Sequence, residues 1–555
     1  MIPRAPLAEL PTHDVTNMPP HLGDQDLWAS DRALREGVAR EGGAWAETTL
    51  AAFGTAAGAR ATFDLGEQAN RAVPELRAFD RYGMRVNQVT FHPAYHALMD
   101  LAIANGLPNF AWNNPKPGGQ VVHAALNYMQ NQAEAGVICP MAMTYAAVAP
   151  LRGTPAVGDD WIPRLLSTRY DDRDIPAAEK HGATMGMFMT EKQGGSDVRA
   201  NSTRAVADGA ARGPGAAYRL TGHKFFCSAP MSDAFLTLAY TDDGLSCFLV
   251  PRWKPDGSRN GLYLQRLKDK LGNRSNASAE MELQDTHGVM VGDEGRGVRT
   301  IIDMVQGTRY YCCFGSAALM RQGLVQALHH TTHRAAFQKK LIQQPLMRNV
   351  LADLAIEAEA AIALTLRIGR ALDAAPGDPA AAAFARLATA IGKYWICKRA
   401  PGHAYEAMEC HGGPGYIEDS PLPRLYREAP VNSIWEGSGN VICLDVLRAL
   451  ARDEGALPAV LDELAAARGG NAALDAAVDA LGAELADRAE PELRARRLTE
   501  SLAVALQASL LVRHAPAAVA DAFCASRLGG RWSGAYGTLP AGCDFDAIID
   551  RARGD

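Results

Sequence analysis

The chain lacks any long uninterrupted apolar run and any surplus of positive charge. Its most apolar windows, such as residues 502–512, are far shorter than the roughly 20 residues that a helix needs to cross a bilayer, so we expect no membrane span. The first residues include prolines and acids where a secretory signal needs apolar residues, which predicts a cytoplasmic protein. Lys and Arg number 56 against 62 Asp and Glu, a net charge of -6, so any site for a polyanion has to be local.

Paired cysteine motifs are also missing. The 10 cysteines are scattered along the chain without a C-x-x-C pair or a regular spacing. This predicts reduced thiols and argues against a zinc site or a disulfide framework. By contrast, 48% of the residues are hydrophobic, which is ample for large cores, and 555 residues are enough for several domains.

Four regions of the chain differ in their sequence pattern. Residues 1–183 contain apolar residues at helical spacing, as in FHPAYHALMDLAIANGL and VVHAALNYMQNQAEAGVICPMAMTYAA, and predict an N-terminal helical domain. Residues 184–291 contain short strand-like runs (YRLTGHKFFCS, AFLTLAYT, LSCFLVPR, AEMELQD) and predict a compact β domain. Long helical patterns return in residues 292–450, notably PLMRNVLADLAIEAEAAIALTLRIGRALDAA, and predict an antiparallel helix bundle.

The last region, residues 451–555, predicts an additional and separate helical domain. Leu474, Val478, Leu481 and Leu485 recur at the spacing of a buried helical stripe. The region holds 11 Arg and no Lys against 16 acidic residues, so its net charge is 11 minus 16, or -5. The four regions together predict a mainly α fold with a central β domain.

Two segments of the β domain are suited to line one planar, polar ring. MTEKQGGSDVRANSTRA ends a strand-like run in two glycines followed by Ser196 and Asp197, so backbone amides and short hydroxyls meet on one loop. In GHKFFCSAPMSDA, Phe225 and Phe226 precede Ser228 and offer an apolar wall and a hydroxyl. Taken alone, a plain turn and a half-buried strand are the commoner interpretations of these patterns.

Two later segments carry candidate anion contacts. HRAAFQKKLIQQPLMR places Arg334 three residues before Phe337, so that on a helix the guanidinium and the ring would share a face. Such an Arg can clamp a phosphate, although a solvated Arg beside a core Phe is more common. Further on, a glycine pair at Gly412 and Gly413 precedes a Gly-Ser-Gly-Asn loop, in which Asn440 is the expected N-cap of an apolar helix.

Glu436 stands at the mouth of that second glycine loop. A glycine loop at a helix N-terminus suits an anion, because unpaired N–H groups and the helix dipole point at the ligand. A carboxylate between Trp435 and Gly437 is expected to have a pKa raised by desolvation, as a base acting near neutral pH requires. The alternative is an ordinary Glu in a loop that leads into a helix.

Together and in this order, these segments resemble the acyl-CoA dehydrogenase superfamily. Its members show T-E-x-x-x-G-S-D, G-x-K-x-x-x-(S/T), R-x-x-F-G, G-G-x-G-Y and a late E-G-(S/T) loop. The segments TEKQGGSDV, KDKLGNRSNAS, LIQQPLMR, LPRLYRE and NSIWEGSGN are similar to the AidB branch of that superfamily. The likeness extends over nearly the whole chain, which makes it far more specific than any single motif.

The resemblance implies an α, β, α core with FAD at the edge of the β domain, and a homotetramer built as a dimer of dimers. It assigns the following residues to the FAD of their own subunit: Met189, Thr190, Gly195, Ser196, Phe226, Ser228, Trp435, Gly437, Ser438 and Asn440. Arg334, Phe337, Gly412 and Gly413 match the element that reaches the FAD of a neighbouring subunit. FAD would then be bound only in an oligomer.

Glu436 matches the base of the family, which removes the α-proton of an acyl-CoA thioester while a hydride passes to the flavin. In the isovaleryl branch the base is the residue before an Arg that matches Arg309, and here that residue is Thr308, so Glu436 is the remaining candidate. Two departures argue against efficient fatty acyl oxidation. Trp435 is bulkier than the usual Tyr, and Gln338 replaces the usual Gly after the motif Phe.

The AidB branch is described as having weak acyl-CoA dehydrogenase activity, binding double-stranded DNA through its C-terminal domain and acting in the response to alkylation damage. Arg448, Arg527 and Arg531 match or lie near basic positions of that domain. Surface or ion-paired arginines are the alternative, because residues 451–555 carry a deficit of positive charge. An ordinary acyl-CoA dehydrogenase with a C-terminal assembly domain, and a binding scaffold that keeps flavin structurally, also stay open.

Overall fold

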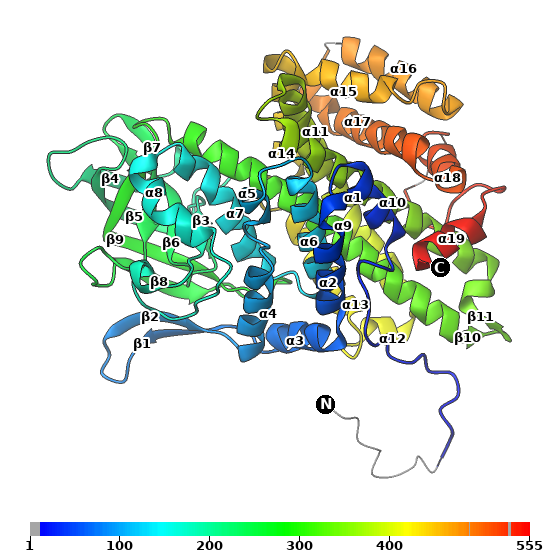
Figure 1. The fold of residues 1–555 in the computed structure, drawn as a ribbon, viewed down its shortest axis with the longest axis horizontal. Coiled ribbons are helices and arrows are strands. Elements are labelled where there is room, and N and C mark those ends of the chain that lie inside the picture. Colours follow the sequence, from blue (N-terminus) through cyan, green and yellow to red (C-terminus); the bar gives the residue numbers. More distant parts are fainter. Residues whose placement is uncertain (1–11, 488, 531–533, 555) are drawn as a thin grey trace.

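Figure 1 shows the computed structural model of the chain, which describes residues 12–487, 489–530 and 534–554. A β barrel lies at one end of the molecule, long helices run through the middle, and the C-terminal helices cover the bundle at the opposite end. The predicted fold class, mainly α with a central β domain, is confirmed.

Helices form most of the N-terminal region. They are α1 (Arg32–Arg40), α2 (Glu47–Gly58), α3 (Arg60–Arg71), α4 (Pro93–Ala104), α5 (Phe110–Asn113), α6 (Gly119–Ala133), α7 (Ile138–Arg152) and α8 (Pro155–Leu165). The helical pattern of residues 121–147 forms two helices rather than one. The Glu134 carboxylate accepts hydrogen bonds from the backbone N–H groups of Gly136 and Val137, at 2.8 and 2.9 Å, which turns the chain between α6 and α7.

The sequence pattern predicted a purely helical N-terminal region, but the structure also contains two strands there. Strands β1 (Glu75–Phe79) and β2 (Arg85–Thr90) form an antiparallel hairpin that extends from the body beside the barrel (Figure 1). The amide oxygen of Asn87 accepts a hydrogen bond from the backbone N–H of Leu264, and Val89 is buried in the core of the barrel. Contacts with a distant part of the chain therefore decide this hairpin.

The β domain is a closed barrel with two flanking strands. Its strands are β3 (Met185–Phe188), β4 (Arg204–Ala207), β5 (Ala217–Ser228), β6 (Ala234–Thr241), β7 (Gly244–Pro251), β8 (Leu262–Leu267) and β9 (Ser278–Val291). The order β6-β4-β5-β9-β7 closes because β7 also pairs with β6, while β3 flanks β6 and β8 flanks β9. The four predicted strand-like runs are confirmed and form β5, β6, β7 and β9, whereas β4 and β8 were not predicted.

The central bundle consists of long helices joined by short connections. They are α9 (Gly297–His333), α10 (Pro345–Ala374) and α11 (Pro379–Glu409), followed by the shorter α12 (Gly413–Tyr416), α13 (Leu422–Glu428) and α14 (Gly439–Arg452). The three long helices pack against one another, and α9 also packs against α6 and α7. No helix in the described part of the chain combines the length and apolar character that crossing a bilayer requires.

The segment after α9 is a hairpin, which corrects the prediction that Arg334 and Phe337 share one face of a helix. α9 ends at His333, and the short strands β10 (Ala335–Ala336) and β11 (Lys339–Lys340) pair antiparallel. Phe337 and Gln338 form the tip with positive φ angles of 50° and 65°. Two successive residues in this left-handed region make the tight turn of a two-residue hairpin, which a helix excludes.

The C-terminal region packs into the same core as the bundle. Its helices are α15 (Ala456–Ala465), α16 (Ala472–Ala486), α17 (Pro491–His514), α18 (Ala517–Arg527) and α19 (Phe545–Arg553). α17 contacts α10, α11 and α14, and α19 contacts α10. The predicted stripe on α16 is confirmed, since Leu474 and Leu481 are buried and Val478 and Leu485 pack partly buried against them. The C-terminal helices therefore share buried surface with the bundle.

Candidate functional site

The loop after β3 and the end of β5 meet at one edge of the barrel. The backbone N–H of Phe225 donates to the carbonyl of Thr190 at 2.8 Å, and Ser228 ends the same strand three residues later. A Cβ atom at Gly195 would lie 2.6 Å from Oγ1 of Thr190, so the loop folds back on Thr190 only because residue 195 is a glycine. The structure thus brings together the two segments of the β domain that the sequence suggested would line one ring.

A buried ion pair holds this loop against the barrel. Nζ of Lys224, on β5, donates to Oε1 of Glu191 at 2.8 Å, and both side chains are fully buried. Glu191 also accepts hydrogen bonds from the hydroxyls of Ser202 and Thr203. Burial alone would raise the pKa of Glu191, but Lys224 and the hydroxyl and N–H donors lower it to about 2.

Sequence reasoning had not assigned a role to either partner of this pair. Glu191 and Lys224 are the charged members of the two motifs T-E-x-x-x-G-S-D and G-x-K. A lysine inside a strand with apolar neighbours was the available signal, because an unpaired buried lysine is rare. The pair explains physically why the two motifs occur together.

Glu436 lies on a strained loop below α9. Its φ angle is +59° and that of Gly437 is +111°, and a non-glycine residue in this region carries a backbone cost. Two buried cations hold the carbonyls of this loop, since Arg309 Nε donates to the Glu436 carbonyl at 3.0 Å and Lys393 Nζ donates to the Gly437 carbonyl. The surrounding structure therefore fixes where the carboxylate points.

The Glu436 carboxylate has one described side-chain donor. Oγ1 of Thr308 donates to Oε2 at 2.7 Å. Burial raises the pKa of Glu436, while the bond from Thr308 and the charges of Arg309 and Lys393 work in the opposite direction. The net shift is upward, in the direction predicted from the sequence, and it suits a group that takes up a proton near neutral pH.

Asp445, on α14, anchors this arrangement from the other side. Its carboxylate accepts from Arg309 Nη1 at 2.8 Å and from Arg386 Nη2 at 2.9 Å. Because Arg309 bridges Asp445 and the Glu436 carbonyl, it connects α9, α14 and the strained loop. Sequence reasoning noted Arg309 but not Asp445 or Arg386.

Asn440 was predicted to be the N-cap of α14, but the structure places another residue there. Ser438 occupies the N-cap position with extended backbone angles, so Asn440 already lies inside the first turn. Its side-chain oxygen accepts a hydrogen bond from Arg496 Nε on α17 at 2.8 Å. The ring of Trp435 is fixed nearby, because its Nε1 donates to the side-chain oxygen of Asn432 at 3.1 Å.

The residues matched to a neighbouring subunit lie apart from this site, at the surface. Phe337 is 93% exposed at the tip of the β10–β11 hairpin, and Arg334 at its base donates to the carbonyl of Asn17 at 2.6 Å. Gly412 has a φ of +63°, and a Cβ atom at Gly412 or Gly413 would meet open space. One chain by itself therefore does not bring these four residues to the barrel edge.

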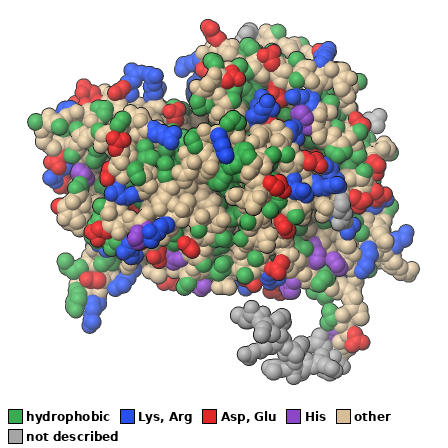
Figure 2. All heavy atoms as spheres, viewed as in Figure 1, with side chains coloured by type: hydrophobic (Ala, Val, Ile, Leu, Met, Phe, Trp, Pro, Cys, Tyr) green, Lys and Arg blue, Asp and Glu red, His purple; other side chains and the backbone are tan. Residues whose placement is uncertain are grey.

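The three predicted DNA contacts have different surroundings. Arg448 is 57% exposed and pairs with an acidic residue one turn earlier. The side chain of Arg527 is 1% exposed and lies between Asp353 and Glu357, at 2.6 and 2.8 Å. It is therefore an ion-paired arginine, which was the alternative to DNA contact. Arg531 lies outside the described residues. On the face shown in Figure 2, basic and acidic side chains are interspersed.

The barrel edge has the donors and walls that a flavin ring needs. Thr190 and Ser228 are half-buried and Ser196 is exposed, so hydroxyl groups are available along one loop and one strand end. Phe226 is 49% exposed although aromatic, which suits a ring packing against it. Together with the loop that folds back on Thr190 at Gly195, this donor set fits FAD, and these hydroxyls are the groups that would hold it.

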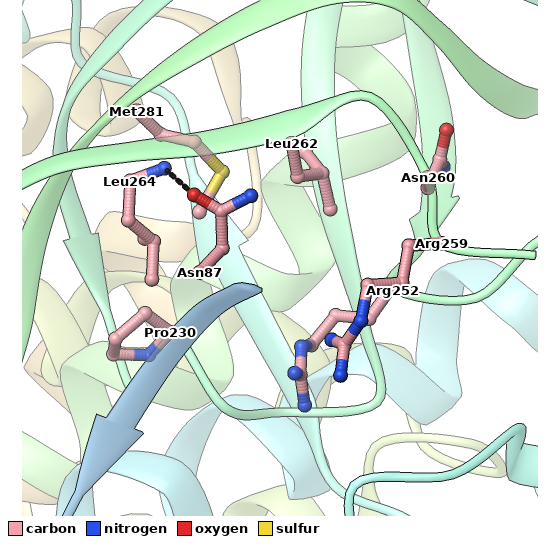
Figure 3. Close-up of a pocket in the computed structure, with 8 residues that line it drawn as sticks. All are labelled: Asn87, Pro230, Arg252, Arg259, Asn260, Leu262, Leu264 and Met281. Carbon is pink, nitrogen blue, oxygen red and sulfur yellow. Dashed lines mark hydrogen bonds between the residues drawn. The ribbon is translucent and has the colours of Figure 1, made fainter. Parts of the chain in front are cut away.

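A hollow lies in the barrel wall (Figure 3). It is lined by Asn87, Pro230, Arg252, Arg259, Asn260, Leu262, Leu264 and Met281. Both of its arginines form ion pairs with Asp174, at 2.7 and 3.0 Å, and none of the described site residues lines it. The hollow is therefore not the candidate site.

Three family models match the chain in sequence order. Residues 17–172 match the N-terminal domain of adaptive response protein AidB. Residues 186–286 match the middle domain of acyl-CoA dehydrogenase, and residues 295–451 match its C-terminal domain. The order and extent of these matches agree with the resemblance drawn from the motifs.

Known proteins show the same likeness. The chain is 48% identical to AidB of Escherichia coli K12 over 82% of this chain and 84% of that protein. It is 33% identical to acyl-CoA dehydrogenase family member 11 of Caenorhabditis elegans, over 71% of this chain and 65% of that protein. The structure of Caenorhabditis elegans ACDH-11 in complex with C11-CoA matches with a TM-score of 0.83 and 26% identity, covering 100% of this chain and 95% of that one. The resemblance is confirmed.

Proposed function

The chain belongs to the AidB branch of the acyl-CoA dehydrogenase family, and we propose that it oxidises an acyl-CoA thioester, with Glu436 as the base. The family consists of flavin-dependent oxidoreductases, so FAD is the cofactor. We infer the substrate class from the family, because the crystal structure of the relative ACDH-11 was solved in complex with C11-CoA.

The observation that carries this proposal is the backbone conformation of Glu436 together with its surroundings. Its backbone is strained, its two flanking carbonyls are held by cations, and burial raises its pKa. Strain that the surrounding structure maintains is typical of functional sites. A structural glutamate in a loop would need neither the strain nor the enclosure.

Four residues have separate roles in the proposed reaction. Glu436 removes the α-proton of the thioester, and Thr308 holds the carboxylate in place by donating to Oε2. Arg309 and Lys393 keep the loop fixed, so that the carboxylate reorganises little during proton transfer. FAD, when bound, accepts the hydride that leaves the β-carbon.

Turnover is proposed to be slow, as in the AidB branch. Trp435 precedes Glu436 directly, and its indole is locked by the hydrogen bond to Asn432, which is itself bonded to Ser316 on α9. A locked indole beside the base narrows the room for an acyl chain. Short or flat acyl groups should therefore react faster than long ones.

The working form is proposed to be a cytoplasmic homotetramer built as a dimer of dimers. Large apolar side chains are exposed on the hairpin and on the helices near α12: Phe337 (93%), Leu346 (83%), Tyr416 (81%) and Ile417 (50%). Exposed apolar side chains of this size favour burial by another subunit. Pairing through this surface would bring Phe337 and the glycine pair to a neighbouring FAD.

A second candidate function is binding of double-stranded DNA in the response to alkylation damage. It is supported by the AidB likeness and by the exposed guanidinium of Arg448. The net charge of -5 in residues 451–555 and the burial of Arg527 weigh against it. We therefore rank it below acyl-CoA oxidation.

Anaerobic titration with a panel of acyl-CoAs, followed by flavin absorbance, tests the first proposal. Wild-type protein should lose its flavin absorbance with at least one acyl-CoA. Glu436→Gln should retain FAD but bleach about 10² to 10⁴ times more slowly, because the base is lost. Glu454→Gln, at an exposed position, is the matched control and should behave as wild type.

Two results would contradict the proposal. Equal bleaching rates in wild type and Glu436→Gln would remove Glu436 as the base. A protein that holds FAD at full occupancy yet bleaches with no acyl-CoA of any chain length would favour a flavin-retaining scaffold.

A further inference from the structure

A chain of hydrogen bonds leads from a lysine to the hydroxyl at the end of β5. Nζ of Lys270 donates to Oγ of Ser278 at 3.1 Å and to the carbonyl of Asn276 at 2.6 Å. Oγ of Ser278 lies 3.0 Å from Oγ of Ser228. Both residues lie in the segment KDKLGNRSNAS, but the sequence reasoning gave neither Lys270 nor Ser278 a role.

The charge on Lys270 sets the donor-to-acceptor direction of this series of hydrogen bonds. An ammonium group can only donate, so it occupies an acceptor position on the Ser278 hydroxyl. The proton of Ser278 is then directed to Ser228, and the Ser228 proton is left to donate elsewhere. Hydrogen bonds arranged head to tail in this way strengthen one another.

Lys270 keeps its charge without a close counter-ion. Among the described residues no carboxylate lies within ion-pair distance of its ammonium group, although Glu428 and Glu134 act on it from further away. Burial lowers the pKa of Lys270 to about 8, and the charges of Cys139, Glu428 and Glu134 oppose that shift. Lys270 is therefore mostly protonated at neutral pH. The carboxylates of Glu428 and Glu134 offset its positive charge only in part.

The same relay faces the candidate site. Cys139, at the start of α7, lies close enough to Lys270, Ser228 and Glu436 for each of them to affect the pKa of its thiol. Ser228 and Glu436 therefore lie near the same thiol, so the end of the relay is close to the proposed base.

We propose that Lys270 is a positioning residue which, through Ser278, orients the Ser228 hydroxyl toward the flavin and makes the bound flavin easier to reduce. Reduction adds negative charge to the ring, and a nearby cation with a directed donor stabilises that charge. The proposal rests on FAD occupying the candidate site, as the proposed function does, but it does not depend on acyl-CoA turnover.

The test measures the reduction of bound flavin in equilibrium with a reference dye, so that no acyl-CoA is needed. Lys270→Met should lower the ratio of reduced to oxidised flavin about tenfold, since a unit charge is lost near the ring. Lys270→Arg keeps the charge and should stay within about threefold of wild type, while Ser278→Ala keeps the charge but breaks the relay and should fall between the two. FAD content and the visible spectrum are recorded for every variant.

Lys254→Met is the control for loss of one positive charge, because Lys254 pairs with Asp256 in the loop between β7 and β8. It should leave the ratio unchanged. A Lys270→Met protein that holds FAD with the wild-type ratio overturns the proposal. If Lys270→Met does not hold FAD, a wild-type ratio in Ser278→Ala overturns it instead.

The outcomes separate this proposal from the proposed function. Wild-type protein that cannot be loaded with FAD contradicts the cofactor assignment and with it both proposals. Wild-type protein that fails to bleach with acyl-CoA, while Lys270→Met still shifts the dye equilibrium, contradicts only the proposed function.

Discussion

Lys224 and Arg527 are both buried basic side chains, but they lie in different kinds of surroundings. Lys224 forms a single pair with Glu191 inside the barrel, directly below the loop of the candidate site. Arg527 joins α18 to α10 through Asp353 and Glu357, far along the chain from that loop. The first pair supports a site, whereas the second attaches one region to another.

The two clusters also differ in how their charges are shared. Glu357 has a second cation, Arg399, at 3.2 Å, whereas Glu191 has no other described cation in ion-pair contact. Removing Lys224 therefore leaves Glu191 with hydroxyl and N–H donors alone. Removing Arg527 leaves Glu357 paired with Arg399 and leaves Asp353 with the backbone N–H groups of Gly537 and Thr538. A network of buried charges should tolerate the loss of one member better than an isolated pair does.

Lys224→Met should have the largest effect on stability. Loss of the partner leaves Glu191 buried without a positive counter-charge, which costs about 3 to 5 kcal/mol of the free energy of unfolding. FAD content should fall as well, because the loop after β3 loses its anchor. Denaturant unfolding and flavin absorbance measure both, with Lys254→Met as the exposed control; a stable variant with full FAD content would show that the pair does not support the site.

Arg527→Met should cost about 3 kcal/mol, the low end of the range for a broken buried pair, because Arg399 still neutralises Glu357. FAD content should stay at the wild-type level, since the network lies away from the barrel edge. Arg468→Met, at an exposed pair, is the matched control. Loss of FAD in Arg527→Met would show that the Arg527 cluster also supports the FAD site, so that the two clusters would not differ in this respect.

Acid should weaken the barrel pair in a defined window. The pKa of Glu191 is lowered from 4.5 to about 2, so the folded state binds the proton less readily than the unfolded state does. The stability gained from ionised Glu191 is present above pH 4.5 and is lost as the pH falls toward 2. Chemical unfolding across this window should show a steeper loss for wild type than for Glu191→Gln; parallel curves would contradict the shift.

The smallest expected effect concerns an exposed arginine. If the protein retains DNA, Arg448→Ala should weaken retention equally for all sequences and lower the slope of log affinity against log salt by about 1. Arg527→Met should leave that slope unchanged, because its guanidinium is buried. An equal change in both variants would mean that overall stability, and not phosphate contact, controls retention.

Local patterns were enough to predict much of the fold. β6 begins and ends with the run AFLTLAYT, and the long pattern from Pro345 forms α10, because a short run with aromatic and β-branched residues favours a strand and a long periodic pattern favours a helix. The motifs likewise led to Glu436 and to the two segments at the barrel edge. Prediction failed at β1–β2 and at the β10–β11 hairpin, where contacts outside the segment decide its conformation.

The site was only partly predictable for the same reason. Glu436 could be found from its neighbours in sequence, but Arg309, Lys393 and Asp445, which hold its loop or anchor it, come from three helices. Asn440 was misplaced because the chain enters α14 at Ser438. Nothing within a few residues of these positions shows which distant side chain will face them.

The amino-acid sequence by itself determined the class of fold, the family with its flavin cofactor, and the acidic residue at the mouth of the second glycine loop. Only the tertiary structure decided which charges are buried and what they hold. Lys224 meets Glu191 across 33 residues and Arg527 meets Glu357 across 170, and such partners are chosen by packing. An arginine or lysine in a sequence carries the same charge wherever it lies, but its energetic role depends on how much water the folded chain leaves around it.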